Sequence, residues 1–276
     1  MIDLAITITT FSMMVMLFKY FDKIRVNNLI AITFNYFTAG TLALSSYLLE
    51  NSFIELKTNT NLNLVIIALI IGTLFVITFN LYAYSAQKIG ITLSTISNKM
   101  SMVIPILIGI ILFKEEVTFF KIIGVFLALG AIVFSSKEDK KSKKLSQLNI
   151  IILFLLFIGQ GLADGLLNWG QRNILNNQNM NLFFTLTFLS AGFAGGLYSF
   201  LKIKTSNLKM DKKSIFWGII LGIPNYLTLL YFIKSLKSEL FSSYQVFPIV
   251  NIGVIVMCTS LSVILFQEKI SIFKWI

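Results

Sequence analysis

The sequence predicts an all-α integral membrane protein made of two inverted five-helix repeats, and three observations lead to this prediction. Of its 276 residues, 56% are hydrophobic and only 13% are charged, whereas about a quarter of the residues in soluble domains are charged. Apolar runs long enough to cross a bilayer recur along the whole chain. A block of residues near the middle is repeated at the C-terminus. The composition therefore argues against a soluble enzyme.

Nine apolar runs can each supply the roughly 20 helical residues that a bilayer requires. They lie at residues 2–20, 28–49, 63–87, 91–113, 118–136, 148–171, 180–201, 214–235 and 240–266. The first run has no basic region before it and no small-residue cleavage signal before Lys19. We therefore expect it to remain in the protein rather than to be removed as a signal peptide.

Proline and glycine predict how some of these helices bend and pack. Pro105, Pro224 and Pro248 each remove a backbone hydrogen bond, so we expect static kinks in three helices. Pairs of glycines four residues apart occur at Gly161 and Gly165, Gly192 and Gly196, and Gly218 and Gly222. Each pair lies on one helix face, where the missing side chains let another helix approach closely.

A repeated block divides the chain into two halves. Residues 111–123 read ILFKEEVTFFKII and residues 264–276 read ILFQEKISIFKWI, with seven of thirteen positions identical. The basic stretch KEDKKSKKLSQ lies between the halves. We predict a first repeat at 1–136, a linker at 137–147 and a second repeat at 148–276. The first block continues into a fifth helix, so we expect the second repeat to hold four helices and the beginning of a tenth.

Five helices is an odd number, so the second repeat must enter the membrane in the opposite orientation to the first. Inverted repeats of this kind are typical of secondary transporters, whose substrate site lies at the repeat interface near the middle of the bilayer. The sequence therefore indicates transport by alternating access.

The repeated motif also carries a family resemblance. In each half, L-F-x-E ends a helix, at Glu115 and again at Glu268, and in the first half a helix with an early glycine, Gly124, follows. This pattern resembles the EamA-like ten-helix members of the drug/metabolite transporter superfamily, over essentially the whole chain. The resemblance implies a secondary carrier, in many members an exporter of amino acids or other metabolites. The two glutamates precede Thr118 and Ser271, which we expect to be N-caps, so we interpret them as turn residues.

The composition excludes several kinds of chemistry. The chain has no histidine and one cysteine, Cys258, which excludes histidine-ligated zinc or haem, histidine-dependent catalytic triads and an intramolecular disulfide. No G-x-x-x-x-G-K-[ST] sequence for ATP binding occurs. We therefore expect no cofactor, no metal and no enzymatic activity, and transport driven by a gradient.

The basic residues indicate an orientation rather than a nucleic-acid partner. The net charge is +11, and sixteen of the 23 Lys and Arg residues lie in the odd-numbered loops. By the positive-inside rule these loops are cytoplasmic and the N-terminus is outside, opposite to the usual topology of the family that the chain resembles. We expect a small-molecule substrate and the lipid bilayer as partners, a monomer or homodimer, and the bacterial cytoplasmic membrane as location.

Two ionisable side chains inside the spans are the main site candidates, because a desolvated charge requires a partner or a water-filled cavity. Lys99 lies about 12 Å into the fourth span and can bind a substrate carboxylate or phosphate, or extend to the interface. Asp164, near the far end of the sixth span, can bind a proton or a substrate amine, or pair with Asn168. Their positions in the spans do not predict a direct ion pair.

Neutral polar and aromatic residues in the spans complete the predicted substrate site. They are Asn35, Asn80, Tyr84, Asn98, Asn168, Trp169, Asn225, Tyr226, Tyr244 and Gln245, with Asn251 as a further polar group. Each can instead form a hydrogen bond between helices. Three rival functions remain at this point: an exporter of cationic drugs that uses Asp164 without Lys99, a lipid flippase, and a scaffold that transports nothing.

Overall fold

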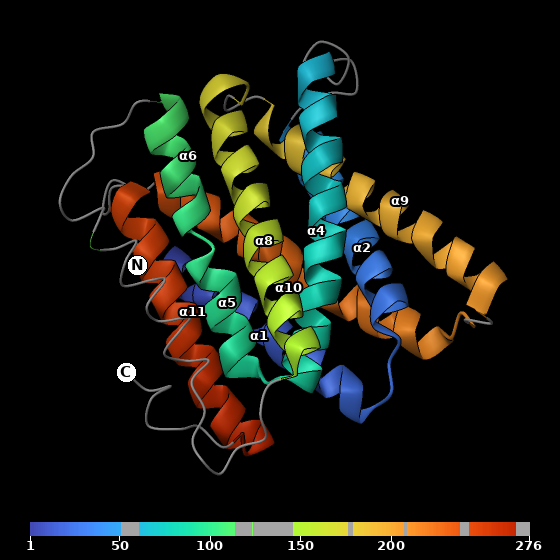
Figure 1. The fold of residues 1–276 in the computed structure, drawn as a ribbon. Coiled ribbons are helices and arrows are strands. Elements are labelled where there is room, and N and C mark those ends of the chain that lie inside the picture. The colour runs from blue at the N-terminus through green and yellow to red at the C-terminus, as the bar shows by residue number, and fades with distance from the viewer. Residues whose placement is uncertain are drawn as a thin grey trace.

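A computed structural model describes residues 1–50, 61–113, 123, 146–175, 179–206, 209–237 and 243–268. Within these residues the chain forms helices and no strands (Figure 1). The helices are α1 (Ile2–Lys23), α2 (Asn28–Glu50), α4 (Leu62–Lys88), α5 (Ile91–Met100), α6 (Val103–Phe113), α8 (Gln147–Asn173), α9 (Met180–Ser206), α10 (Lys212–Lys237) and α11 (Ser243–Phe266). The predicted fifth helix at 118–136, apart from Ile123, most of the linker, and the beginning of the tenth helix lie outside the described residues.

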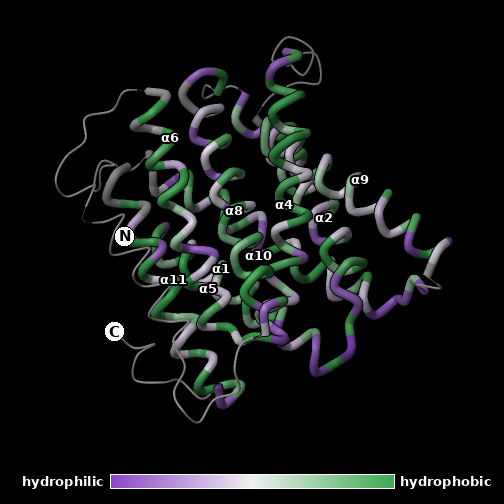
Figure 2. The backbone as a smooth tube through the Cα atoms, viewed as in Figure 1, coloured by the Kyte–Doolittle hydropathy of each residue, from purple (hydrophilic) through white to green (hydrophobic). Residues whose placement is uncertain are grey.

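The prediction of an all-α membrane protein is confirmed. Eight segments of the described chain are long and apolar enough to cross a bilayer. Figure 2 shows hydrophobic residues running along the helices, with hydrophilic residues mainly at their ends. Large apolar side chains such as Phe154, Leu197 and Ile223 are exposed on the outside of the bundle, where a lipid bilayer would cover them.

Helices from distant parts of the chain pack against one another. The most extensive contacts join α2 to α9 and α10. On one side of this group α9 packs against α4, and on the other α10 packs against α1. Helix α8 contacts α4, α5 and α6, and α5 also contacts α11. Helices α1, α4, α8 and α11 therefore all contact α5, the helix that carries Lys99.

The fourth predicted span is broken into two helices. Instead of one helix over 91–113, α5 ends at Met100 and α6 begins at Val103. Pro105 has no N–H to donate to the Ser101 carbonyl, which accepts a hydrogen bond from the Ile104 N–H at 2.9 Å instead. The expected kink thus becomes a break. Helices α10 and α11 instead continue through Pro224 and Pro248.

Glycines on α8 bring this broken helix close, as predicted. A Cβ atom added at Gly161 would lie 2.3 Å from Ile104, and one at Gly165 would lie 2.5 Å from Ile108. Because a side chain at either glycine would displace an isoleucine of α6, the two glycines let α6 pack closely against α8. This approach places the polar residues at the end of α5 beside those of α8.

The start of α5 lies against the motif glutamate of the second half. Gly90 precedes the helix with a φ of +131°, a conformation that only glycine adopts readily. A Cβ atom there would lie 2.1 Å from Oε1 of Glu268, which follows the end of α11. The Glu268 carboxylate therefore lies at the N-terminus of α5, where the helix dipole favours negative charge.

Candidate functional site

The structure brings the two predicted ionisable residues, Lys99 and Asp164, close to each other. Lys99 lies in the last turn of α5 and Asp164 lies on α8, and their charges interact. Among the described residues, the ion pair within 4 Å is Lys88 with Asp22, at 3.1 Å. Lys99 and Asp164 are thus neighbours without a direct ion pair, and both side chains remain partly accessible.

An aromatic ring holds the Lys99 ammonium group. Its nitrogen lies 3.4 Å from the centre of the Phe11 ring, which α1 supplies. Aromatic rings attract cations at this distance, by about 2 kcal/mol or more where water is excluded. The Phe11 ring in turn lies 6.3 Å from the buried ring of Tyr82 on α4. The ring that contacts the cation is therefore itself packed against α4.

A chain of amide groups holds the Asp164 carboxylate. Gln160, one turn earlier on α8, donates from Nε2 to Asp164 Oδ1 at 2.9 Å. Its Oε1 accepts a hydrogen bond from Nδ2 of Asn98 on α5, at 3.2 Å. Because one amide uses both its donor and its acceptor, the orientation of the Gln160 side chain is determined at both ends. The chain connects α5 to α8 directly beside Lys99.

Further polar groups surround this cluster. The Tyr82 hydroxyl donates to Thr95 Oγ1 on α5 at 2.8 Å. Ser12 of α1 has a buried hydroxyl oxygen without a hydrogen-bond partner. Cys258 of α11 is a buried free thiol. We define the central cluster as Phe11, Asn98, Lys99, Gln160 and Asp164.

Two other predicted residues pair with each other away from this cluster. Asn225 of α10 donates from Nδ2 to Oδ1 of Asn35 on α2, at 3.1 Å, and both are buried. Tyr226, the next residue on α10, shares a hydrogen bond with the Ser46 hydroxyl of α2. These bonds join α10 to α2, which is the structural role that such residues often have in membrane bundles.

The remaining predicted residues are dispersed. Asn80 donates to the Val76 carbonyl of its own helix at 2.8 Å, and the Tyr84 side chain is 39% exposed. Asn251 of α11 contacts the Met102 sulfur at the break between α5 and α6, at 3.1 Å. Asn168 and Trp169 follow Asp164 by about one turn of α8. The side chains of Tyr244 and Gln245 lie outside the described part of the structure.

Sequence reasoning missed two members of the cluster. Gln160 is a polar residue in an apolar run, four positions before Asp164 and therefore on the same helix face. This spacing could have identified it. Phe11 is one of 26 phenylalanines. No sequence pattern identifies it as the one whose ring contacts Lys99, 88 positions later.

The chemistry of the cluster favours binding over catalysis. It offers one cation and one carboxylate with amide groups between them. In the residues that the structure describes, no group of three or more His, Cys, Asp or Glu side chains could hold a metal ion. A small molecule that carries both an anionic and a cationic group matches this arrangement.

Comparison with known proteins points to a transporter. Residues 2–137 match the EamA-like transporter family. The chain is also 28% identical over 255 residues to a protein of Haemophilus influenzae described as uncharacterized, with 89% of this chain and 83% of that protein covered. The helical fold and the match together indicate a multi-pass membrane transporter rather than an enzyme. Residues 2–137 are therefore similar to the EamA-like transporter family.

Proposed function

We propose that the protein is a secondary active transporter that exports a small zwitterionic metabolite, such as an amino acid, across the bacterial cytoplasmic membrane by alternating access. The observation that carries the proposal is the pair Lys99 and Asp164. The two charges are close enough to interact, yet each is held by another side chain rather than by its opposite charge.

This arrangement leaves both charges able to bind a substrate. The Lys99 ammonium can bind a carboxylate, and the Asp164 carboxylate can bind an ammonium group. A zwitterion supplies both in one molecule and so compensates the cost of keeping two charges inside a membrane. The break between α5 and α6, which begins directly after Met100, supports the same location, because transporters often build their substrate sites at interrupted helices.

Matched contacts support the proposed pair of repeats. A Cβ atom at Gly72 of α4 would lie 2.5 Å from the Thr187 carbonyl of α9, and one at Gly222 of α10 would lie 2.7 Å from the Asn35 carbonyl of α2. These residues correspond at offsets of 150 and 152 positions, close to the 153 of the repeated block. The same close contact thus occurs twice, each time between a glycine of one half and a carbonyl group of the other, as expected of two related repeats that pack against each other.

Asp164 is also the proposed site of proton coupling. A carboxylate that binds a substrate amine in one state and a proton in the next would exchange one for the other. Export of cationic drugs is the alternative. Lys99 disfavours it, because the nearby ammonium repels a cation at Asp164. A lipid flippase and a scaffold are further alternatives. The following experiment distinguishes both of them from a metabolite transporter.

A thermal-shift screen of the purified full-length protein tests the proposal. The ligands are amino acids, nucleosides, sugars and cationic drugs, and the variants are Lys99→Ala and Asp164→Asn. A bound ligand raises stability by about 2.7 kcal/mol at one hundred times its dissociation constant. We expect stabilisation by amino acids that both variants lose. Lys88→Gln, which changes the exposed lysine paired with Asp22, is the control and should keep the shift.

Stabilisation by cations alone that requires Asp164 but not Lys99 would replace the proposal with drug export. Absence of any shift with every ligand would leave the flippase and the scaffold. Either result would contradict a zwitterion site at the central cluster.

A further inference from the structure

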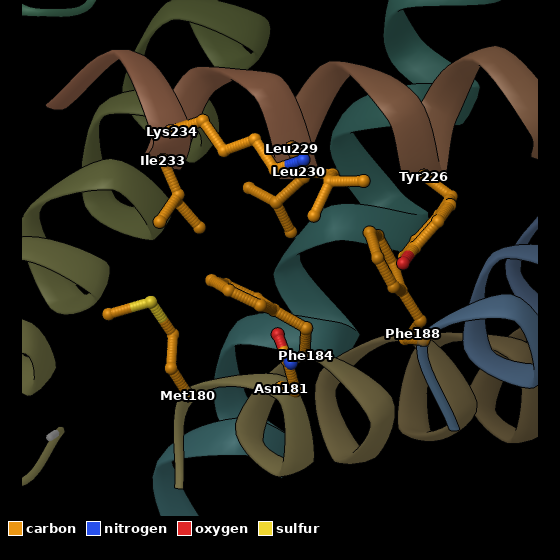
Figure 3. A pocket seen from close by; sticks show the side chains of 10 residues that line it. Met180, Asn181, Phe184, Phe188, Tyr226, Leu229, Leu230, Ile233 and Lys234 are labelled. Atoms are coloured by element: carbon orange, nitrogen blue, oxygen red, sulfur yellow. The ribbon is translucent and has the colours of Figure 1, made fainter. Parts of the chain in front are cut away.

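A cavity lies apart from the central cluster, between α9 and α10. It has a volume of about 170 Å³, and Ala43 of α2 forms part of its floor. Figure 3 shows Met180, Phe184 and Phe188 of α9 on one side of the cavity and Leu229, Ile233 and Lys234 of α10 on the other. Its walls are therefore mainly apolar, with a lysine among them.

Two polar residues of the cavity, Lys234 and Asn181, belong to the ends of their spans. Lys234 is the second-last residue of the candidate span Lys212–Ser235, and Asn181 is the second residue of Met180–Thr205. From there the cavity extends along α10 to Tyr226, eight residues or about 12 Å deeper. The Tyr226 hydroxyl closes the inner end through its bond to Ser46 of α2. The cavity thus has Lys234 and Asn181 from the span ends, the Tyr226 hydroxyl at its inner end, and apolar side chains between them.

The two helices leave a gap that another group must fill. Although α9 and α10 are consecutive, extensive contacts join each of them to α2 and not to each other. Side chains around an unfilled apolar gap lose dispersion contacts. In a bilayer the molecules at hand to fill it are lipid acyl chains.

We propose that this cavity binds an anionic phospholipid, with an acyl chain between Phe184 and Leu229 and the phosphate at Lys234. The Lys234 side chain is exposed and its nitrogen lies 5.0 Å from the centre of the Tyr231 ring. Figure 3 shows the side chain extending along α10 beside Leu229 and Leu230, where the ammonium can meet a phosphate that enters the cavity. Asn181 also lines the cavity. Among the described residues that line the cavity none is acidic, so none of them repels a phosphate.

The charge complementarity identifies the lipid class. A basic residue near the membrane surface favours an anionic headgroup by about 1 kcal/mol, while an apolar cleft alone would accept any acyl chain. The site shares no residue with the central cluster. The two proposals can therefore fail separately.

Native mass spectrometry of the purified full-length protein tests the lipid site. The protein is titrated with phosphatidylglycerol and with phosphatidylcholine of the same acyl chains. We expect one phosphatidylglycerol to bind more tightly than phosphatidylcholine. Lys234→Gln should weaken this binding by about fivefold and remove the preference between headgroups. Inorganic phosphate, which has no acyl chain, should neither bind nor displace the lipid.

Matched variants distinguish lipid binding in the cavity from nonspecific attraction of anionic lipids to exposed lysines. Lys204→Gln is the control, because Lys204 is also an exposed lysine near the end of a span, 4.5 Å from the Phe200 ring, but does not line the cavity. It should bind as the wild type does. Leu229→Trp fills the cavity and should abolish binding. Size-exclusion chromatography shows whether this variant is folded.

Three results would overturn the proposal. Equal affinity for the two lipids would remove the role of charge. Unchanged binding by Lys234→Gln, or an equal loss in Lys204→Gln, would remove the assignment to Lys234. A folded Leu229→Trp variant that still binds phosphatidylglycerol would show that the acyl chain lies elsewhere.

Discussion

The Lys99 ammonium nitrogen lies 3.4 Å from the centre of the Phe11 ring, and its charge also interacts with Asp164 without forming an ion pair. The ring therefore attracts the cation in competition with the carboxylate. In a membrane, a lysine and an aspartate with no other partners would form an ion pair with each other. A substrate would have to break that ion pair before it could bind. A cation held by a neutral ring keeps its charge uncompensated, so it can still attract a substrate carboxylate.

The Phe11 ring should consequently affect substrate affinity. Phe11→Leu removes the cation–π contact, so Lys99 can move to Asp164 and compete with the substrate. We expect the affinity for the best stabilising amino acid to fall by about 2- to 30-fold, which corresponds to about 0.5–2 kcal/mol. Isothermal titration calorimetry measures this affinity in the wild type and in the variant. Phe11→Tyr keeps a ring and should bind normally. Unchanged affinity in Phe11→Leu would mean that the ring does not hold Lys99 in the free protein.

The bond between Asn98 and Gln160 should couple α5 to α8. In a double-mutant cycle with Asn98→Ala and Gln160→Ala, we expect a coupling energy of about 0.6–1.7 kcal/mol, the range for hydrogen bonds between membrane helices. The free energies of unfolding of the four proteins, measured in mixed detergent, give this coupling energy. Asn98→Ala combined with Asn225→Ala, whose partner is Asn35, should be additive. Additivity of the first pair would contradict the amide chain.

The matched glycines should be equally intolerant of a side chain. Gly72→Ala and Gly222→Ala each place a Cβ atom within 2.7 Å of a carbonyl oxygen on the facing helix. We expect both to lower the free energy of unfolding by about 1–3 kcal/mol, as overpacking does. At Gly196 the nearest atom would be 3.9 Å away, so Gly196→Ala should change stability by less than about 0.5 kcal/mol. If only one glycine were sensitive, the matched contacts would not support two repeats.

Gly90 should be sensitive for two separate reasons. In Gly90→Ala the alanine must adopt a positive φ, and its Cβ atom clashes with the Glu268 carboxylate. We therefore expect a loss of about 1–3 kcal/mol in the free energy of unfolding. Combining it with Glu268→Ala relieves the steric contact but not the backbone strain. The double variant should therefore be more stable than the sum of the two single losses predicts. Simple additivity, measured by thermal unfolding, would separate Glu268 from the start of α5.

Much of this architecture could be predicted because bilayer insertion depends on local composition. Apolar runs predicted the spans of all described helices, and Pro105 predicted a bend in the fourth. Whether a proline bends or breaks a helix depends on its neighbours, and Pro224 of α10 leaves its helix continuous. The glycine pair of α8 predicted close packing, but not that α6 would be the partner.

The candidate site could be predicted only in part. Lys99 and Asp164 are conspicuous because charges are rare inside membranes. Which neutral residues join them depends on how helices face each other, and so Asn98 belongs to the cluster while Asn80 bonds to its own helix. Asn35 and Asn225 were predicted on polarity alone, but in the structure they pair with each other.

Counterflow of radiolabelled amino acids into proteoliposomes tests the central claim most directly. Vesicles with the wild-type protein and an internal excess of an unlabelled amino acid should accumulate the labelled one. Lys99→Ala and Asp164→Asn should each abolish accumulation, while Lys88→Gln should accumulate it as the wild type does. Accumulation that persists in both Lys99→Ala and Asp164→Asn would contradict a substrate site at the central cluster.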